Sequence, residues 1–288
     1  MIFFPPCKIN LGLRILRKRP DGFHDLETLF YPVPLRDALE LLPSDECRVH
    51  VSGIPIPGDP LSNLCLKAYA LLSADFPSIR PVEVYLYKHI PLGAGLGGGS
   101  ADGAYTLLGL NRLFRLGLSR EQLLPYALRL GSDCPFFLYE GPCLGSGRGE
   151  VLTPVELDLS GYPLVLVNPG IHVDTGWAFR ELAALRGAGG GARGAGADGA
   201  TGRMHGHGAE EGAAGLGPIS TWKDTLANDF EPVVFKAHPE VERIKVALYD
   251  HGAVYAAMTG SGSTVFGIFP KEEKPGLSFP EGYWIAYC

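Results

Sequence analysis

The chain has 288 residues, of which 46% are hydrophobic and 19% are charged, and its net charge is −6. This composition is typical of a soluble globular protein, and at about 150 residues per domain the length predicts two domains. The negative balance disfavours nucleic-acid binding, which normally needs a basic stripe. The six cysteines include no C-x-x-C pair, which indicates reduced thiols in a cytoplasmic protein. We expect neither a secretory signal at the start nor a membrane span, since no apolar run approaches ~18 residues.

The first part of the chain begins with strand patterns. Four segments are strand-like in sequence, and a Pro-Asp-Gly turn at 20–22 follows the first of them. These four segments are 2–16, 26–33, 37–42 and 47–53. Apolar residues at helical intervals predict a helix over 60–76, and strict alternation from Val82 onward predicts a strand over 82–90.

Two further helices are expected before residue 155. The first covers 101–114, where Ser100 stands in the position of an N-cap. The second covers 118–131, because Ser119 and Gln122 form a capping box at its start and Gly131 ends it.

The second part of the chain mixes helices with locally connected strands. We expect a buried strand at 162–170, helices at 174–185 and 239–252, and three closing strands at 253–258, 263–269 and 283–287. This order predicts an α+β fold rather than a regular doubly wound sheet. The expected domains are residues 1–155 and 156–288.

Residues 187–217 differ from the rest of the second domain. Thirteen glycines and eight alanines among these 31 residues cannot bury enough surface to offset the entropy of ordering. We therefore expect a flexible Gly/Ala-rich insertion. Its His205 and His207 are too few for a metal site and are interpreted as incidental.

Residues 88–104, KHIPLGAGLGGGSADGA, hold six glycines, five of them between a predicted strand and a predicted helix. Each glycine costs conformational entropy, so such a density indicates tight turns or a close approach of the backbone to a ligand. A glycine loop that leads into a helix N-terminus binds phosphate, because unpaired N–H groups and the helix dipole both face the anion.

Three other interpretations of this loop fit less well. A P-loop needs a lysine where Gly99 stands. The dinucleotide pattern G-x-G-x-x-G is present at Gly93, Gly95 and Gly98, but the strand before it alternates and only cations lie near the expected acidic position. A turn without a ligand needs only one or two glycines, so it does not explain this number of glycines. The interpretation that remains is a phosphate-binding loop of another kinase fold.

Three motifs along the chain resemble those of the GHMP kinases. PLGAGLGGGSADGA resembles their central ATP-binding motif, PPCKINLGLRI (5–15) their first motif, and MTGSGSTVFGIF (258–269) their third. KRPDGFHDLETLF (18–30), GSDCPFF (131–137) and NDFE (228–231) resemble a branch that phosphorylates a cytidine diphosphate conjugate of methylerythritol. The resemblance covers nearly the whole chain except 187–217.

The resemblance implies a two-domain α+β fold with a cleft between the domains. The N-terminal domain would be ribosomal-protein-S5-domain-2-like and the C-terminal domain ferredoxin-like. It implies ATP-dependent phosphorylation of the 2-hydroxyl of the methylerythritol part, in the non-mevalonate isoprenoid pathway. The alternatives are another GHMP kinase, such as a homoserine or mevalonate kinase, or a non-catalytic nucleotide-binding module of the same fold.

The resemblance also assigns residues to ATP and to catalysis. Asp133 matches the catalytic aspartate, which orients the acceptor hydroxyl and takes its proton. Lys8 matches the catalytic lysine, which stabilises Asp133 and the transferring group. Without the resemblance, Asp133 would be interpreted as capping a turn and Lys8 as a solvated cation. The expected ATP-binding residues are Asn63, Lys88, Pro91, Leu92, Gly93, Ala94, Gly95, Leu96, Gly97, Gly98, Gly99, Ser100 and Ala101.

Substrate recognition is expected from Asn10, Phe23, His24 and Phe179. Phe23 would stack on the cytosine and His24 would read its edge, while Phe179, or nearby Trp177, would complete the stack. Gly260, Ser261 and Gly262 form the third-motif loop. Mg²⁺ is expected to arrive with ATP, since the sequence names no metal ligand and no tightly bound cofactor is expected. The partners are small molecules, neither nucleic acid nor membrane, and the enzyme would be a monomer or a homodimer.

Overall fold

The computed structural model describes residues 1–188, 215–272 and 275–288. These residues divide into two compact units. Unit 1 comprises 1–8, 32–92 and 96–154, and unit 2 comprises 9–31, 93–95 and 155–288. The predicted boundary between residues 155 and 156 stays a prediction, because stretches of the first half of the chain belong to unit 2.

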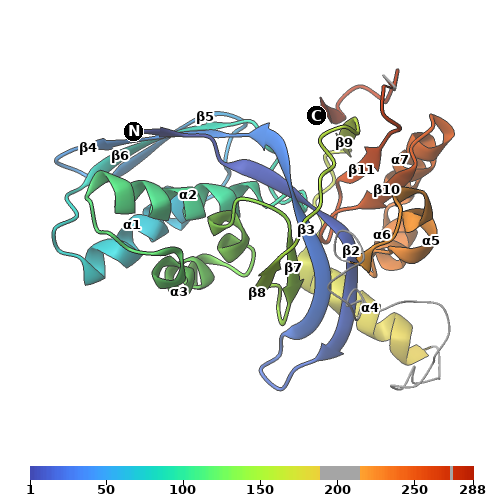
Figure 1. The fold of residues 1–288 in the computed structure, drawn as a ribbon, viewed down its shortest axis with the longest axis horizontal. Helices are drawn as coiled ribbons and strands as arrows, with labels where there is room; N and C mark the ends of the chain where they lie inside the picture. The colour runs from blue at the N-terminus through green and yellow to red at the C-terminus, as the bar shows by residue number, and fades with distance from the viewer. Residues whose placement is uncertain (189–214, 273–274) are drawn as a thin grey trace. The chain divides into compact units, whose positions relative to one another are not determined.

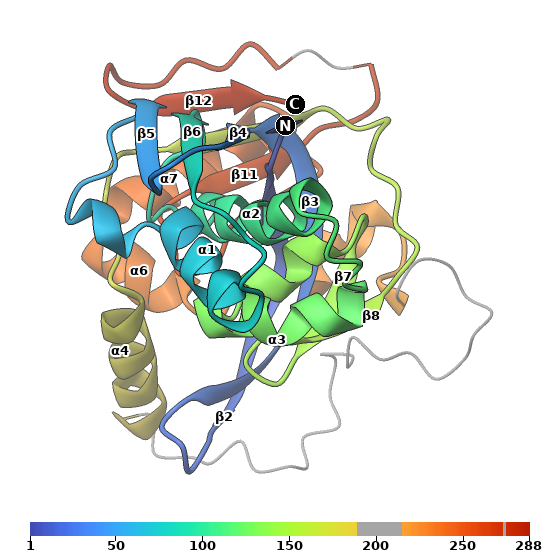
Figure 2. The ribbon, with the colours of Figure 1, turned by 90° about the vertical axis from the view of Figure 1, so that its left-hand side faces the viewer.

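Unit 1 is built on a four-stranded sheet with the order β1-β4-β6-β5. The first three strands pair antiparallel, whereas β5 runs parallel to β6, with Val49 opposite Val84. Three helices, α1, α2 and α3, lie on one side of this sheet (Figures 1 and 2). The strands are β1 Ile2–Phe3, β4 Ala38–Pro43, β5 Arg48–Gly53 and β6 Val82–Lys88, and the helices are α1 Leu64–Asp75, α2 Gly98–Leu113 and α3 Arg120–Leu130.

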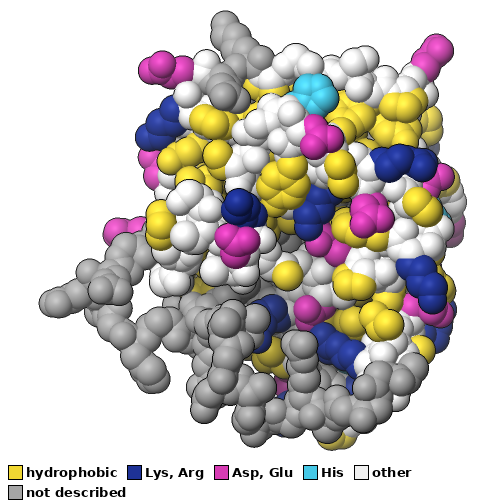
Figure 3. Space-filling view, turned by 90° about the vertical axis from the view of Figure 1, so that its right-hand side faces the viewer, with side chains coloured by type: hydrophobic (Ala, Val, Ile, Leu, Met, Phe, Trp, Pro, Cys, Tyr) yellow, Lys and Arg dark blue, Asp and Glu magenta, His cyan; other side chains and the backbone are white. Residues whose placement is uncertain are grey.

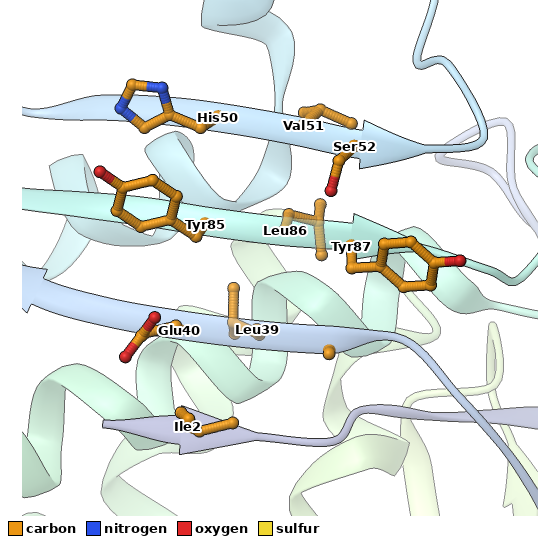
Figure 4. A pocket seen from close by; sticks show the side chains of 10 residues that line it. Ile2, Leu39, Glu40, His50, Val51, Ser52, Tyr85, Leu86 and Tyr87 are labelled. Carbon is orange, nitrogen blue, oxygen red and sulfur yellow. The ribbon is translucent and has the colours of Figure 1, made fainter.

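The other face of this sheet carries polar and aromatic side chains. The rings of His50 and Tyr85 stack with their centroids 4.6 Å apart, and Tyr87 is 54% exposed. These side chains line a hollow of about 310 Å³ on the side of the sheet from which Leu39 and Leu86 point away (Figure 4). The alternation predicted for β6 is therefore confirmed.

Unit 2 is built on an antiparallel sheet with the order β10-β11-β9-β12. Every residue of β9, β10 and β11 is buried, and α6 and α7 pack with these strands in one apolar core. The elements are β9 Leu164–Asn168, α4 Thr175–Ala188, η4 Ile219–Thr221, α5 Trp222–Thr225, α6 Glu231–Ala237, α7 Pro239–Asp250, β10 Tyr255–Met258, β11 Val265–Ile268 and β12 Trp284–Tyr287.

A third sheet has the order β2-β3-β7-β8. Its long strands β2 and β3 contain residues of both units, and short helical turns complete the fold. These elements are β2 Pro6–Lys18, β3 His24–Arg36, η1 Pro60–Ser62, η2 Cys134–Leu138, β7 Cys143–Ser146 and β8 Val151–Pro154. The predicted α+β class is confirmed, and so is the capping box of α3. The sequence patterns missed the short helices α5 and α6.

Most of the predicted insertion, residues 189–214, lies outside the described residues, and so do His205 and His207. Its flexibility and their incidental role stay predictions. Across the described ranges, no helix has both the length and the apolar character needed to cross a bilayer. On the face drawn in Figure 3, Lys and Arg side chains lie among Asp and Glu rather than in a stripe of one sign, among the residues shown in colour.

Gly109 explains how closely α2 approaches the sheet of unit 1. A glycine in mid-helix costs about 1 kcal/mol of helix propensity, yet a Cβ here would lie 2.4 Å from Leu41 Cδ1 and 2.9 Å from Phe3 Cε2. A side chain at this position would therefore force the buried Leu41 and Phe3 side chains, or α2 itself, to shift.

We predict that Gly109→Val lowers the free energy of unfolding by about 1–3 kcal/mol, because it overpacks this contact. Gly99→Val is the matched control in the same helix, since nothing lies within 4 Å of its Cβ. The control should change stability by about 0.5 kcal/mol or less. Urea unfolding measures both values, and equal effects would contradict the packing explanation.

Candidate active site

The glycine loop passes into α2 earlier than its sequence suggests. Gly97 is the N-cap, with a φ of +70° in the left-handed region, and the helix begins at Gly98. The prediction that Ser100 is the N-cap is therefore wrong by three residues. The helix begins earlier because Gly97, in the left-handed conformation, ends the loop, so Gly98 and Gly99 are already helical.

Two lysines lie directly beneath this helix start, within unit 1. A Cβ on Gly97 would lie 3.1 Å from Lys8 Cγ and 3.0 Å from Phe137 Cζ. A Cβ on Gly98 would lie 2.9 Å from Lys88 Nζ. A side chain at Gly97 or Gly98 would therefore require these neighbours to move, so the close packing favours glycine at both positions.

Lys8 and Asp133, the predicted catalytic pair, meet in unit 1. Lys8 Nζ lies 3.4 Å from Asp133 Oδ2, and the lysine side chain is 3% exposed while the aspartate side chain is 37% exposed. Asp133 precedes η2, but its side chain makes no capping hydrogen bond. The backbone N–H of Lys8 donates to the carbonyl oxygen of Leu96 at 2.9 Å. The pair therefore lies against the loop with its carboxylate partly open.

Gly95 makes a very close backbone approach to Thr259 within unit 2. Its φ is +77°, and a Cβ would lie 2.0 Å from the carbonyl oxygen of Thr259. Thr259 Oγ1 in turn donates to the Gly95 carbonyl at 3.2 Å and accepts from the Asn10 N–H at 3.0 Å. Residues of the central motif and the third motif are thus joined through backbone groups.

Two asparagines hold the third-motif turn at Gly260. Asn10 Oδ1 accepts from the Gly260 N–H at 2.9 Å, and Asn228 Nδ2 donates to the Gly260 carbonyl at 2.8 Å. Asn10 is 3% exposed and also donates to Thr28. Its predicted contact with substrate stays a prediction. The sequence analysis assigned no role to Asn228, although the NDFE motif contains it.

Asn63 and Lys88, the two other residues expected to bind the nucleotide, make hydrogen bonds within the protein. Asn63 Oδ1 accepts from the Cys65 N–H at 2.8 Å and caps α1. Lys88 is fully buried and donates to Asp37 and Asp102. Burial and the charge of Asp37 outweigh the attraction of Lys88 and raise the pKa of Asp102 to about 7. Whether Asn63 and Lys88 line a nucleotide pocket stays a prediction.

Asp37 and Asp102 were missed by the sequence analysis, but one signal pointed to them. Alternation in β6 places Lys88 on the same face as Val82, Val84 and Leu86, the buried face. A lysine at such a position needs buried counter-charges.

The expected cytosine site lies in unit 2. The rings of His24 and Phe179 are stacked, with centroids 4.3 Å apart and planes 12° apart. Phe23 is 50% exposed, whereas Trp177 makes an edge contact with His238. Burial, followed by the charges of Lys18 and Arg186, lowers the pKa of His24. At neutral pH the imidazole is therefore uncharged and offers one donor and one acceptor nitrogen.

The described part of the chain contains no group of three or more His, Cys, Asp or Glu side chains that could hold a metal ion. In unit 1 the end of the glycine loop lies beside an ammonium–carboxylate pair. Such a combination is suited to binding and transferring a phosphoryl group.

Comparisons with known proteins agree with this chemistry. Residues 63–141 match the N-terminal domain of the GHMP kinases, and residues 213–276 match their C-terminal domain. The two matches define the class of protein, a GHMP kinase.

Named relatives narrow the class. The chain is 48% identical to 4-diphosphocytidyl-2-C-methyl-D-erythritol kinase of Bacteroides fragilis over 95% of this chain and 94% of that protein. It is 44% identical to the kinase of the same name from Bacteroides thetaiotaomicron over 99% and 96%. A crystal structure of 4-(cytidine 5′-diphospho)-2C-methyl-D-erythritol kinase is 31% identical with a TM-score of 0.70, over 93% of this chain and 90% of that chain. The chain belongs to this family of GHMP kinases.

We predict that Gly95→Ala is more harmful than an ordinary change at a left-handed glycine. An alanine in the left-handed region costs about 1–2 kcal/mol, and the collision with the Thr259 carbonyl adds to this cost. Gly117→Ala is the matched control, because Gly117 has a φ of +69° and open space around its Cβ. Gly95→Ala should lower the free energy of unfolding by about 1–3 kcal/mol more than the control does. Equal losses in urea unfolding would contradict the close approach.

Proposed function

We propose that the chain transfers the γ-phosphoryl group of ATP to the 2-hydroxyl of 4-diphosphocytidyl-2-C-methyl-D-erythritol, a step of the non-mevalonate isoprenoid pathway. The names of the relatives support this substrate, and the loop geometry supports a triphosphate ligand. The proposal includes a cytoplasmic enzyme that acts as a monomer or a homodimer.

The observation that carries the proposal is the position of Lys8 and Asp133. The Asp133 carboxylate is partly exposed and makes no capping bond, so it is available to an acceptor hydroxyl. The hydroxyl oxygen would attack the γ-phosphorus, its proton would pass to Asp133, and the bond to the leaving ADP would break. The Lys8 ammonium would stabilise the charge on the transferring group.

ATP would bind along the glycine loop as its magnesium complex. The N–H groups of 93–100 and the dipole of α2 favour the triphosphate at this position. Magnesium would enter as part of the co-substrate, held mainly by phosphate oxygens and water.

The acceptor would be recognised through its cytosine base. Phe179, rather than Trp177, is assigned to the stack, because Phe179 already lies against His24 while Trp177 contacts His238. A centroid separation of 4.3 Å leaves no room for a base between the two rings. The base would therefore displace the His24 ring from the face of Phe179, and the uncharged imidazole would contact the edge of the base. The exposed ring of Phe23 would stack on the base.

A panel of acceptors tests the assignment directly. ATP consumption should be measured with 4-diphosphocytidyl-2-C-methyl-D-erythritol, homoserine, mevalonate and galactose. We expect turnover with the cytidyl compound alone. Turnover with a competitor but not with the cytidyl compound would assign the chain to another GHMP activity, and no turnover with any acceptor would favour a nucleotide-binding module.

We predict that Asp133→Ala lowers kcat by about 10²–10⁴-fold, the usual contribution of a general base. Affinity for a non-hydrolysable ATP analogue should change little, since the loop N–H groups remain. Asp45→Ala, which removes an exposed carboxylate between β4 and β5, serves as the control. Loss of ATP affinity with unchanged kcat would show that Asp133 has a different role.

A further inference from the structure

Three charged side chains are buried together in unit 1 beneath the glycine loop. Lys88 ends β6, Asp37 connects β3 to β4, and Asp102 belongs to α2; each is 2% exposed or less. Lys88 Nζ donates to Asp37 Oδ2 and, at 2.9 Å, to Asp102 Oδ2. We refer to these three residues as the loop triad.

The loop triad contacts both ends of the glycine loop. Asp37 Oδ1 accepts from the N–H groups of His89 and Ile90, at 2.6 and 2.9 Å, just before the loop begins. At the other end, the Lys88 ammonium lies under Gly98, where a Cβ would be only 2.9 Å away. One ammonium therefore connects the residues that enter the loop with the first turns of α2.

Stability alone does not account for such an arrangement. Burying ions carries a large desolvation cost, and well-packed apolar residues of similar volume usually stabilise a core as well or better. A buried ionic cluster is better explained by the geometry it fixes. Here that geometry is the spacing between the two ends of the loop.

We propose that Lys88, Asp37 and Asp102 are positioning residues that hold the glycine loop in its ATP-binding conformation without touching the nucleotide. This inference deepens the proposed kinase function and rests on it. It assigns Lys88 an indirect role in place of a direct contact with ATP.

The charge of the loop triad adds a pH dependence. Asp102 is faced by Lys88 from β6, by Asp37, and by the thiol of Cys65 from α1. Its Oδ1 is buried and has no hydrogen-bond partner among the described residues. Burial raises the pKa of Asp102 to about 7. Below pH 7 Asp102 is therefore protonated, and the charges of Lys88 and Asp37 cancel, so the triad has no net charge. Above pH 7 the triad carries one net negative charge beside the loop, which opposes binding of the triphosphate.

The decisive measurement is the Kd of a non-hydrolysable ATP analogue, determined by calorimetry on the full chain. Lys88→Met should raise this Kd at least tenfold. Leu110→Ala is the control for a buried change in unit 1, because Leu110 is a fully buried residue of α2 that lies outside the triad. The control should lower Tm but leave the Kd within twofold. A Lys88→Met protein that binds the analogue as tightly as the wild type would overturn the proposal.

Asp102→Asn provides a second test if Lys88→Met does not fold. This change removes the titrating group while keeping its shape. The ratio of the wild-type Kd to the variant Kd should rise at least threefold from pH 6 to pH 8.5, and titration of the ligand cancels in this ratio. A flat ratio would overturn the proposal. Because the analogue needs no acceptor, this result is separate from whether the cytidyl compound is phosphorylated.

Discussion

The structure depends on a glycine backbone that approaches its neighbours more closely than any side chain would allow. Gly95 lies against the carbonyl of Thr259, and Gly97 and Gly98 lie over Lys8 and Lys88. Because glycine has no side chain, the backbone N–H groups of the loop are not covered and can face an anion. The glycines lose conformational entropy on folding. Hydrogen bonds from Asn10 and Asn228 hold the neighbouring turn at Gly260 in place.

The two lysines beneath the loop differ in ways that suit different tasks. Lys8 is paired with a carboxylate that is 37% exposed, so a substrate can reach this pair. Lys88 is paired with two carboxylates that are almost completely buried, so protein groups enclose its ammonium. A cation with an open partner is suited to stabilising developing charge, whereas an enclosed cation is suited to fixing backbone geometry.

Local patterns were sufficient for much of this fold. The alternation of β6, the capping box of α3 and the buried strands of unit 2 each depend on a few neighbouring residues, and the structure contains them all. The start of α2 was placed too late, because glycine has a low helix propensity and hides the first helical turn. The proposed catalytic pair came from motif resemblance, since Lys8 and Asp133 are 125 positions apart and no local pattern joins them. Asp37 and Asp102 were missed for the same reason. Trp177 and Phe179 could not be ranked until the ring contacts of each were known.

The central claim, that the glycine loop is the triphosphate site and places ATP beside Lys8 and Asp133, is tested most directly by a crystal structure with a non-hydrolysable ATP analogue. We predict phosphate oxygens about 3 Å from the backbone nitrogens of residues 93–100, a normal hydrogen-bond length, with the γ-phosphate next to the Lys8 ammonium. Phosphates bound elsewhere, with the loop nitrogens left to solvent, would contradict it.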